Sequence, residues 1–310
     1  MPIWGSSDTR LERGFYRAVV RLFTTPGMMI EKPAHCMDRV MRPAEKIASC
    51  DPIWSALRAQ AEELAESEPE LASFAHATIL KHDRLEDALS YHLARKLGGE
   101  DLSPLQLREL FAEGFAADKR IGEAVRADLA AVYQRDPACH CYAQAFLFFK
   151  GFHALECYRL AHFLWTQGRR LMALFVQNRI SDLFAVDIHP AAQLGRGIMI
   201  DHATGVVIGE TAVVGDDVSM LHGVTLGGTG KQNEDRHPKI GRGVLLSVGA
   251  KVLGNIHIGE YSKVGAGSVV LKPVPPYTTV AGVPARVIGK VGTPHPSQDM
   301  NHDFPDDSTK

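Results

Sequence analysis

The sequence has almost no net charge, no long apolar run and few cysteines, and each of these shortages excludes a class of protein. Lys plus Arg number 34 and Asp plus Glu number 36, so the formal net charge of −2 gives no reason to expect nucleic acid or an anionic membrane as a partner. No uninterrupted apolar run reaches the ~18 residues of a membrane-spanning helix. The five cysteines are odd in number and lack the spacing of a disulfide framework. We therefore expect a globular protein of a reducing compartment, the cytoplasm.

A complete metal-binding pattern is also lacking. The run Cys139-His140-Cys141 has the form of half a site, but no second cysteine pair completes it. We therefore expect free thiols and no bound metal.

Residues 1–50 differ in character from the rest. Four arginines alternate with apolar residues at helical spacing: Arg10, Leu11, Arg13, Phe15, Arg17, Val19, Arg21 and Leu22. Such a basic amphipathic segment is typical of an organelle presequence, but Asp8 and Glu12 are acidic and no apolar signal core follows. We interpret residues 1–50 as an extension, either a solvated helix or a loose chain.

Between residues 51 and 182 the signals are helical. Asp51-Pro52 and Ser103-Pro104 each place a capping side chain before a proline, which predicts a helix start at both positions. Gly98-Gly99 predicts the end of a helix, and a helical pattern continues from about residue 143 to 167. The sequence thus predicts an all-helical domain over 51–182.

From residue 183 onward, aliphatic or small residues recur every six positions, a period that neither an ordinary helix nor an ordinary strand produces. These anchors are Ile188, Leu194, Ile200, Val206, Ala212, Val218, Val224, Ile240, Leu246, Val252, Ile258, Val264 and Val270. A β-solenoid explains them, because a triangular coil has three sides of one hexad each and every anchor points inward. We predict this solenoid over 183–290.

One interruption breaks the hexad register. Val224 and Ile240 are 16 residues apart, which is one hexad plus ten further residues. The insertion lies within 227–239, a polar and charged segment that holds Arg236 and His237. Insertions into solenoids form loops on the outside of the coil, often on the binding face. We therefore predict one protruding loop with a role in function.

Longer motifs occur in both regions. The repeats contain DIHPAAQLGRGIMIDHATGVVIGETAVVGDDV, VTLGGTGK, DRHPKIGRGV and VPAR, and the helical region contains RDPA and KGFHALECYRL. Over roughly residues 51–290 these motifs resemble the hexapeptide-repeat serine O-acetyltransferases. The resemblance implies an α+β protein, with an N-terminal all-helical domain, a left-handed parallel β-helix and, beyond it, a flexible tail over 291–310. The hexads themselves do not reveal the hand of the coil.

The resemblance also implies the reaction, in which acetyl-CoA and L-serine give O-acetyl-L-serine and CoA at the first step of cysteine biosynthesis. A base must take the hydroxyl proton, and histidine suits this task when a carboxylate orients it. The family motif places the base at His202 and its carboxylate at Asp187. These residues are 15 positions apart against a coil of 18, so the spacing permits their contact without requiring it.

Serine binding requires partners for a carboxylate and an ammonium group. Arg236 suits the carboxylate, because a guanidinium can bind it through two hydrogen bonds. The resemblance assigns Asp136 and Asp201 to the ammonium group and His237 to the polar end of the substrate, in a site between two protomers. Asp136 has a second interpretation, since aspartate before proline is also an ordinary turn. Glu210 is either a support for His237 or a surface residue.

Acetyl-CoA is expected in the groove between adjacent solenoids. The positions that match the family pattern are Gly228, Val248 and Ala266, through their backbone groups. Arg286 and Lys290 suit the CoA phosphates, or else form a solvated basic end of the solenoid.

The resemblance further implies homotrimers that pair through their helical domains into hexamers. L-cysteine is the expected feedback inhibitor, since it is nearly isosteric with serine. Family members commonly end in isoleucine, which enters O-acetylserine sulfhydrylase. This chain ends in Lys310, and a charged residue is costly in an apolar pocket, so we do not expect that complex.

Two alternatives belong to other classes of function. A zinc lyase similar to the γ-class carbonic anhydrases would use His202, His222 and His237 as ligands, but it leaves Arg236 and the helical domain unexplained. A catalytically idle cysteine-sensing scaffold protein would retain the fold, but the Asp187–His202 pair argues for activity.

Overall fold

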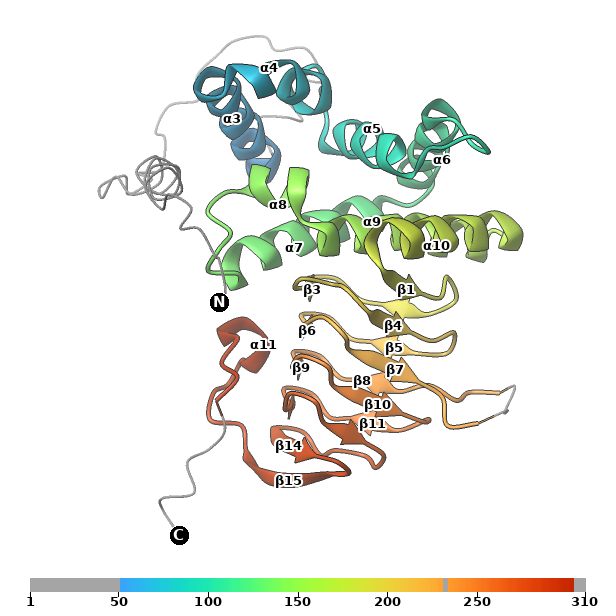
Figure 1. Cartoon of the computed structure of the whole chain (residues 1–310), viewed down its shortest axis with the longest axis vertical. Coiled ribbons are helices and arrows are strands. Elements are labelled where there is room, and N and C mark those ends of the chain that lie inside the picture. Colours follow the sequence, from blue (N-terminus) through green and yellow to red (C-terminus); the bar gives the residue numbers. More distant parts are fainter. Residues whose placement is uncertain (1–50, 231–233, 304–310) are drawn as a thin grey trace, which may run out of the picture. The chain divides into compact units, whose positions relative to one another are not determined.

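Helices occupy the first part of the described chain and short strands the second (Figure 1). The computed structural model describes residues 51–230 and 234–303. The helices are α3 (Pro52–Ser67), α4 (Pro69–Ala75), η1 (His76–Leu80), α5 (Leu85–Leu97), α6 (Pro104–Ala117), α7 (Lys119–Arg135), α8 (Tyr142–Phe148), α9 (Lys150–Thr166), α10 (Arg170–Phe184) and α11 (Pro296–Asp299). None of these helices is long and apolar enough to cross a membrane. The helix pattern within residues 1–50 lies outside the described residues.

Helix ends form at the positions where local signals predict them. Asp51 Oδ1 accepts a hydrogen bond from the backbone N–H of Trp54 (3.1 Å) at the start of α3. Ser103 and Gln106 form a capping box at the start of α6, and α5 ends at Gly98. The capping side chains satisfy N–H groups that the first turn of a helix otherwise leaves unpaired.

The single helix predicted over about 143–167 is wrong, because the structure breaks it in two. Phe149 has an extended conformation (φ −86°, ψ 111°) and separates α8 from α9. Two buried histidines stabilise this break. His92 Nε2 and His153 Nε2 donate hydrogen bonds to carbonyl oxygens at the end of α8, over 3.2 and 2.8 Å. Local periodicity does not register such distant contacts.

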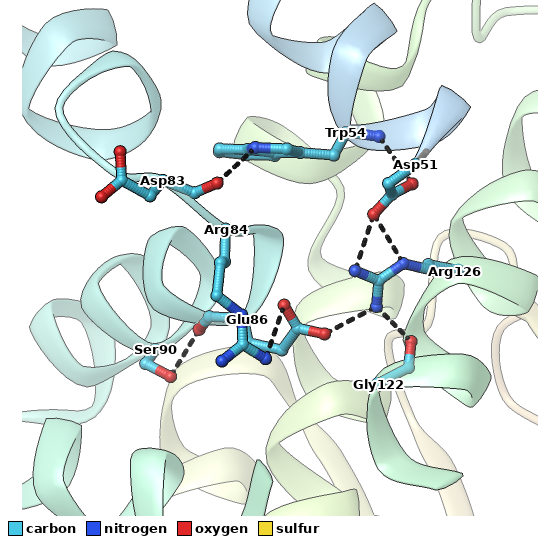
Figure 2. A network of polar contacts seen from close by, with 8 residues as sticks. All are labelled: Asp51, Trp54, Asp83, Arg84, Glu86, Ser90, Gly122 and Arg126. Atoms are coloured by element: carbon cyan, nitrogen blue, oxygen red, sulfur yellow. Dashed lines mark hydrogen bonds and ion pairs between the residues drawn. The ribbon is translucent and has the colours of Figure 1, made fainter. Parts of the chain in front are cut away.

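A polar network joins three helices (Figure 2). Arg126 on α7 contacts Asp51, the capping residue of α3, and Glu86 on α5, with N–O distances of 2.7 and 2.8 Å. It also donates to the carbonyl oxygen of Gly122 (2.8 Å). Burial, the largest influence, raises the pKa of the Glu86 carboxyl, but hydrogen bonds from Arg126 and the backbone and the charges of Arg126 and Arg84 together outweigh it and leave the pKa lowered. The network therefore links the start of α3 to α5 and α7.

The strands form three sheets of parallel strands, which confirms a helical region followed by a parallel β-solenoid. Sheet A contains β1 (Val186–Ile188), β4 (Val206–Ile208), β7 (Thr225–Gly227), β10 (Lys251–Leu253) and β13 (Val269–Val270). Sheet B contains β2 (Gln193–Leu194), β5 (Val213–Val214), β8 (Lys239–Ile240) and β11 (His257–Ile258). Sheet C contains β3 (Met199–Ile200), β6 (Ser219–Met220), β9 (Leu245–Leu246), β12 (Lys263–Val264), β14 (Thr278–Gly282) and the antiparallel β15 (Ala285–Lys290).

The register of the solenoid differs from the hexad count over residues 202–226. Ile188 pairs with Ile208, so the first coil has 20 residues rather than 18. The next coil has 18 residues, and Leu226 then pairs with Val252, 26 positions later. The ten extra residues are therefore divided, with two in the turn after β3 and eight in the protruding loop before β8.

The hexad count missed this division because two residues of each hexad point inward. Side chains two positions apart in a strand lie on the same face. Val206 and Ile208 are both buried, as are Val224 and Leu226. A shift of two residues thus exchanges one inward position for another, and an aliphatic period alone cannot distinguish the two registers.

The C-terminal tail is folded as far as the structure describes it. Residues 291–303 follow the β14–β15 hairpin and include α11. Ser219 Oγ donates to the carbonyl oxygen of Ser297 (2.7 Å), and His302 Nδ1 lies 3.0 Å from Ser247 Oγ. The prediction of a flexible tail is therefore wrong for these residues. The final residues, on which the prediction about the sulfhydrylase depends, lie outside the described part of the chain.

Candidate active site

The turn between β3 and β4 carries His202. His202 and Ala203 have left-handed backbone angles (φ 55° and 56°), which are uncommon for residues other than glycine. The turn joins β3 to β4, and the strand pairing shows that it contains the two extra residues of the first coil. The His202 side chain is 72% exposed, and its Nε2 lies 3.6 Å from Asp201 Oδ2. The longer turn thus projects an imidazole from the corner between sheets C and A.

Other titratable groups gather near this imidazole, and we name Asp136, Asp201, His202 and His222 the His202 group. The rings of His202 and His222 lie 5.8 Å apart. Burial raises the pKa of Asp201, His202 lowers it and the Asp136 carboxylate raises it, with a net increase. Asp136 therefore lies near Asp201 in space. It also accepts a hydrogen bond from Ala138 N (2.8 Å), so the ordinary turn is present as well.

Asp187 lies on β1, next to the strand that follows the His202 turn. Its backbone pairs with Val207 of β4, and its Oδ1 accepts a hydrogen bond from Gln177 Nε2 on α10 (2.6 Å). Within the described residues, the ion-pair contact of His202 is with Asp201, and none joins it to Asp187. The structure therefore places Asp187 on the strand beside the one that the His202 turn enters, without a direct contact between the two side chains.

His237 lies at the opposite corner, where the protruding loop returns to β8. Its ring is buried and packs over Gly209, where a Cβ atom would lie 2.0 Å from Nε2. Thr211 N donates to His237 Nδ1 (3.2 Å), so Nδ1 is an acceptor and the neutral ring carries its proton on Nε2. Burial lowers the pKa of His237, and the neighbouring Arg236 and Lys239 lower it further.

Arg236 lies beside His237 and pairs with Glu210. Arg236 Nη2 is 2.7 Å from Glu210 Oε2, and this hydrogen bond lowers the pKa of Glu210. Thr211 Oγ1 accepts hydrogen bonds from the backbone N–H groups of Arg236 (3.0 Å) and His237 (3.1 Å). The closest support of His237 is therefore Thr211 rather than Glu210. We name His189, Glu210, Arg236 and His237 the His237 group, because His189 is electrostatically coupled to Glu210 and Arg236.

The two groups occupy opposite edges of sheet A. The turn of His202 enters β4, and Gly209, under His237, follows the same strand. The three residues of β4 separate the two edges, and three residues of a strand span about 10 Å. Among the described residues, no hydrogen bond or ion pair joins the His202 group to the His237 group. A single chain therefore presents the predicted site as two separate halves.

Two of the predicted acetyl-CoA positions align with His222 on successive coils. Gly249 N donates to the carbonyl oxygen of His222 (3.0 Å), and Gly267 N donates to that of Val248 (2.8 Å). Val248 and Ala266 therefore continue the corner that begins at the His202 turn, at about 4.8 Å per coil. Gly228 follows β7 at the other corner, where the loop leaves the solenoid, and the Arg286 side chain on β15 is exposed.

A cavity in the described part of the chain lies elsewhere. It has a volume of about 510 Å³ and is lined by α7, α9 and the corner after β2, including Arg120, Tyr158, Arg159 and Arg196. None of the predicted site residues lines it. The predicted site residues therefore lie outside this cavity.

The sequence assigned no role in binding serine or acetyl-CoA to His189, His222 or Thr211. Corner residues point away from the core, so the hexad pattern carries no signal for them. The one available signal was the coil length, because His222 follows His202 by one coil.

Comparisons with known proteins bear on the family of this chain. Two family models match the chain: "Serine acetyltransferase, N-terminal" over residues 53–157 and "Bacterial transferase hexapeptide (six repeats)" over residues 237–272. A serine acetyltransferase of Salmonella typhimurium is 56% identical over 252 residues, which are 81% of this chain and 92% of that protein. This chain belongs to the serine acetyltransferase family. It is therefore an acyltransferase, as the resemblance predicted.

Further relatives include a plant protein and three solved structures. Serine acetyltransferase 4 of Arabidopsis thaliana is 54% identical over 256 residues, 83% of this chain and 72% of that protein. A serine acetyltransferase in complex with cysteine has 52% identity and a TM-score of 0.80, covering 82% of this chain and 98% of that one. The enzyme of Brucella abortus in complex with coenzyme A has 53% identity and a TM-score of 0.78, covering 79% and 98%. The soybean enzyme complexed with serine has 56% identity and a TM-score of 0.75, covering 76% and 97%.

Family membership does not favour either alternative function. For the zinc lyase, His202 and His222 are neighbours, but His237 belongs to the other group. Within residues 51–230 and 234–303, no three His, Cys, Asp or Glu side chains are placed to hold a metal ion.

Proposed function

We propose that this chain transfers the acetyl group of acetyl-CoA to the hydroxyl of L-serine, and that His202 is the general base. The supporting observation is the His202 turn, which is two residues longer than an ordinary coil requires and exposes an imidazole beside the Asp201 carboxylate. As the serine oxygen attacks the acetyl carbon, His202 takes the hydroxyl proton and then returns it to the departing thiolate of CoA. The base is thereby regenerated without an acetyl-enzyme.

The role we propose for Asp187 is to orient this imidazole and to stabilise its protonated form. Asp187 lies on β1 and the His202 turn enters the adjacent strand β4, and in our proposal the two side chains reorient into contact. Asp187 would then exchange its hydrogen bond from Gln177 for one from His202.

The two groups supply complementary charges for an amino acid. In our proposal Asp136 and Asp201 bind the ammonium group, and a nearby cation favours the ionised form of Asp201 that burial opposes. Arg236 binds the carboxylate in place of Glu210. His237 donates Nε2–H to a substrate oxygen, and so belongs to both the binding and the catalytic machinery.

We further propose that each site forms between two copies of the chain. The separation of the two groups across sheet A supports this, because one edge of sheet A can meet the opposite edge of the next copy. Such a head-to-tail contact closes into a ring, and three copies give a trimer. The pairing of trimers through the helical domains is part of the same proposal.

Acetyl-CoA is proposed to lie in the groove between copies, as the resemblance implies. Val248 and Ala266 support this path, because they continue the corner of the His202 turn along successive coils. Gly228 would border the groove from the loop side. Arg286 would meet the phosphates, for which its exposed guanidinium is suited.

L-cysteine is proposed as a feedback inhibitor that occupies the serine site, since it differs from serine only in the thiol. We also propose the cytoplasm as the place of action. The described cysteines, Cys139, Cys141 and Cys157, are all free thiols, which fits a reducing compartment.

Thiol release from acetyl-CoA tests this function, measured with and without L-serine and with added L-cysteine after subtraction of its own thiol. We expect serine-dependent release that cysteine suppresses. His202→Ala should lower turnover by about 10²–10⁴. Arg236→Ala should raise the KM for serine more than the KM for acetyl-CoA. His257→Ala provides a matched control, because His257 is an exposed histidine on the last strand of sheet B.

The outcomes separate the parts of the proposal. Thiol release that does not depend on serine would contradict the proposal that L-serine is the acetyl acceptor. Full turnover of His202→Ala would remove His202 as the base, and a selective effect of Arg236→Ala on acetyl-CoA would mean that the protruding loop serves the other substrate.

A further inference from the structure

The helical domain contacts the His202 turn directly, at the first residues of α9. Gly151 packs so closely against this turn that a Cβ atom would lie 1.9 Å from the carbonyl oxygen of Ile200. The same Cβ would lie 3.4 Å from Ala203 Cβ. Because the nearest atom belongs to the backbone, no side chain fits here without movement of the helix or the turn.

A chain of hydrogen bonds continues this contact to His202 itself. Lys150 Nζ donates to Thr204 Oγ1, and Thr204 Oγ1 donates to the carbonyl oxygen of His202 (3.3 Å). The Thr204 hydroxyl therefore links the first residue of α9 to the backbone of the proposed base.

The turn requires such support because its conformation is unfavourable by itself. The turns of the two coils that follow each have one left-handed residue, Gly223 or Gly249, and Gly205 occupies the same place in the His202 turn. The His202 turn has two further left-handed residues, His202 and Ala203, and both carry side chains that disfavour this conformation. Its connections to the solenoid are backbone bonds, including those from Gly205 N to Ala185 O (2.7 Å) and from Gly223 N to Thr204 O (2.8 Å).

We propose that Lys150, Gly151 and Thr204 are positioning residues that hold the His202 turn in its reactive geometry. This inference rests on the proposed role of His202. It makes the helical domain a part of the catalytic machinery through α9, because the same helix that packs in the helical core also fixes the base.

The test compares Thr204→Val with Thr204→Ser, and Lys150→Met with Lys150→Arg. Valine keeps the shape of threonine but lacks the hydroxyl, whereas serine keeps the hydroxyl. We expect kcat to fall by about 10- to 100-fold in Thr204→Val and Lys150→Met, with the KM for acetyl-CoA unchanged. Thr204→Ser should restore most of the turnover. Thr204 is exposed, so the unfolding midpoints should match that of the wild type.

A double-variant cycle distinguishes positioning from a general loss of structure. If Thr204 acts only through the base, Thr204→Val should lower kcat little or not at all in a His202→Ala background. An equal loss in both backgrounds would overturn the proposal, as would wild-type turnover of Thr204→Val and Lys150→Met beside an inactive His202→Ala. A selective rise in the KM for a substrate in Lys150→Met would also overturn it, because Lys150 would then bind substrate. Full turnover of His202→Ala would instead refute the proposed function.

Discussion

At the scale of single residues, the absence of a side chain at Gly209 determines where His237 lies. The imidazole occupies the space of a Cβ atom at this corner, and Thr211 N fixes its tautomer by donating to Nδ1. The proton on Nε2 is consequently available to a substrate. The lowered pKa of His237 keeps the ring neutral near pH 7, so it acts as a donor without a competing charge.

Gly209→Ala tests this arrangement. The new methyl group would displace the ring, because a Cβ atom lies 2.0 Å from Nε2, whereas the backbone of Gly209 is not in the left-handed region. We expect the KM for serine to rise about tenfold or more, the effect of losing a hydrogen bond to a charged group. Steady-state kinetics measure it, with Gly292→Ala as the control, since no atom lies near that position. An unchanged KM and kcat for Gly209→Ala would exclude His237 from the site.

At the scale of elements, the sequence predicted the helix starts, because contacts between residues close in the chain determine them. Asp51 and Ser103 cap helices whose starts were predictable, because each capping side chain bonds to a residue three positions away. The break at Phe149 was not predictable from the helix itself, since His92 on another helix stabilises it. The two-residue insertion at His202 was also not predictable, because the hexads continue through it at the alternate inward position.

The two histidines at the α8–α9 break also determine how the helical domain responds to acid. Their rings lie 5.1 Å apart, and each donates its Nε2 proton to a carbonyl oxygen. Burial lowers the pKa of His92 to about 4, and burial with the neighbouring His92 lowers that of His153 to about 3, from an ordinary value of 6.5. The unfolded chain therefore binds more protons than the folded one below pH 6.5.

It follows that the free energy of unfolding should fall as the pH drops from 6.5 towards 4. Each histidine contributes a slope of about 1.4 kcal/mol per pH unit within this window and nothing above it. Urea unfolding at several pH values measures the slope. His92→Gln, which keeps an N–H donor for the carbonyl oxygen, should reduce the slope while leaving stability at pH 7.5 nearly unchanged. A slope equal to that of the wild type would show that His92 is not the group that titrates.

At the scale of the whole molecule, the solenoid holds apart the residues that the proposed reaction requires in one site. His202 and Arg236 lie at opposite edges of sheet A, and the large cavity of the chain contains neither. In the proposed ring, one copy provides the base and the next provides the carboxylate partner. Every site of a closed ring is then equivalent, and an isolated chain has none.

Mixing two variants with different defects tests this shared site. His202→Ala chains retain Arg236, and Arg236→Ala chains retain His202, so a ring assembled from both contains some sites with both residues intact. Co-expression of the two variants with different tags, followed by purification through both tags, gives the mixed rings. A mixed ring of three chains has one neighbouring pair in the required order, so about a third of its sites have both residues intact. Thiol release near a third of the wild-type rate is expected, measured at a serine concentration near the wild-type KM, where sites that lack Arg236 contribute little. Mixed rings no more active than the two variants alone would place both residues of each site in one chain.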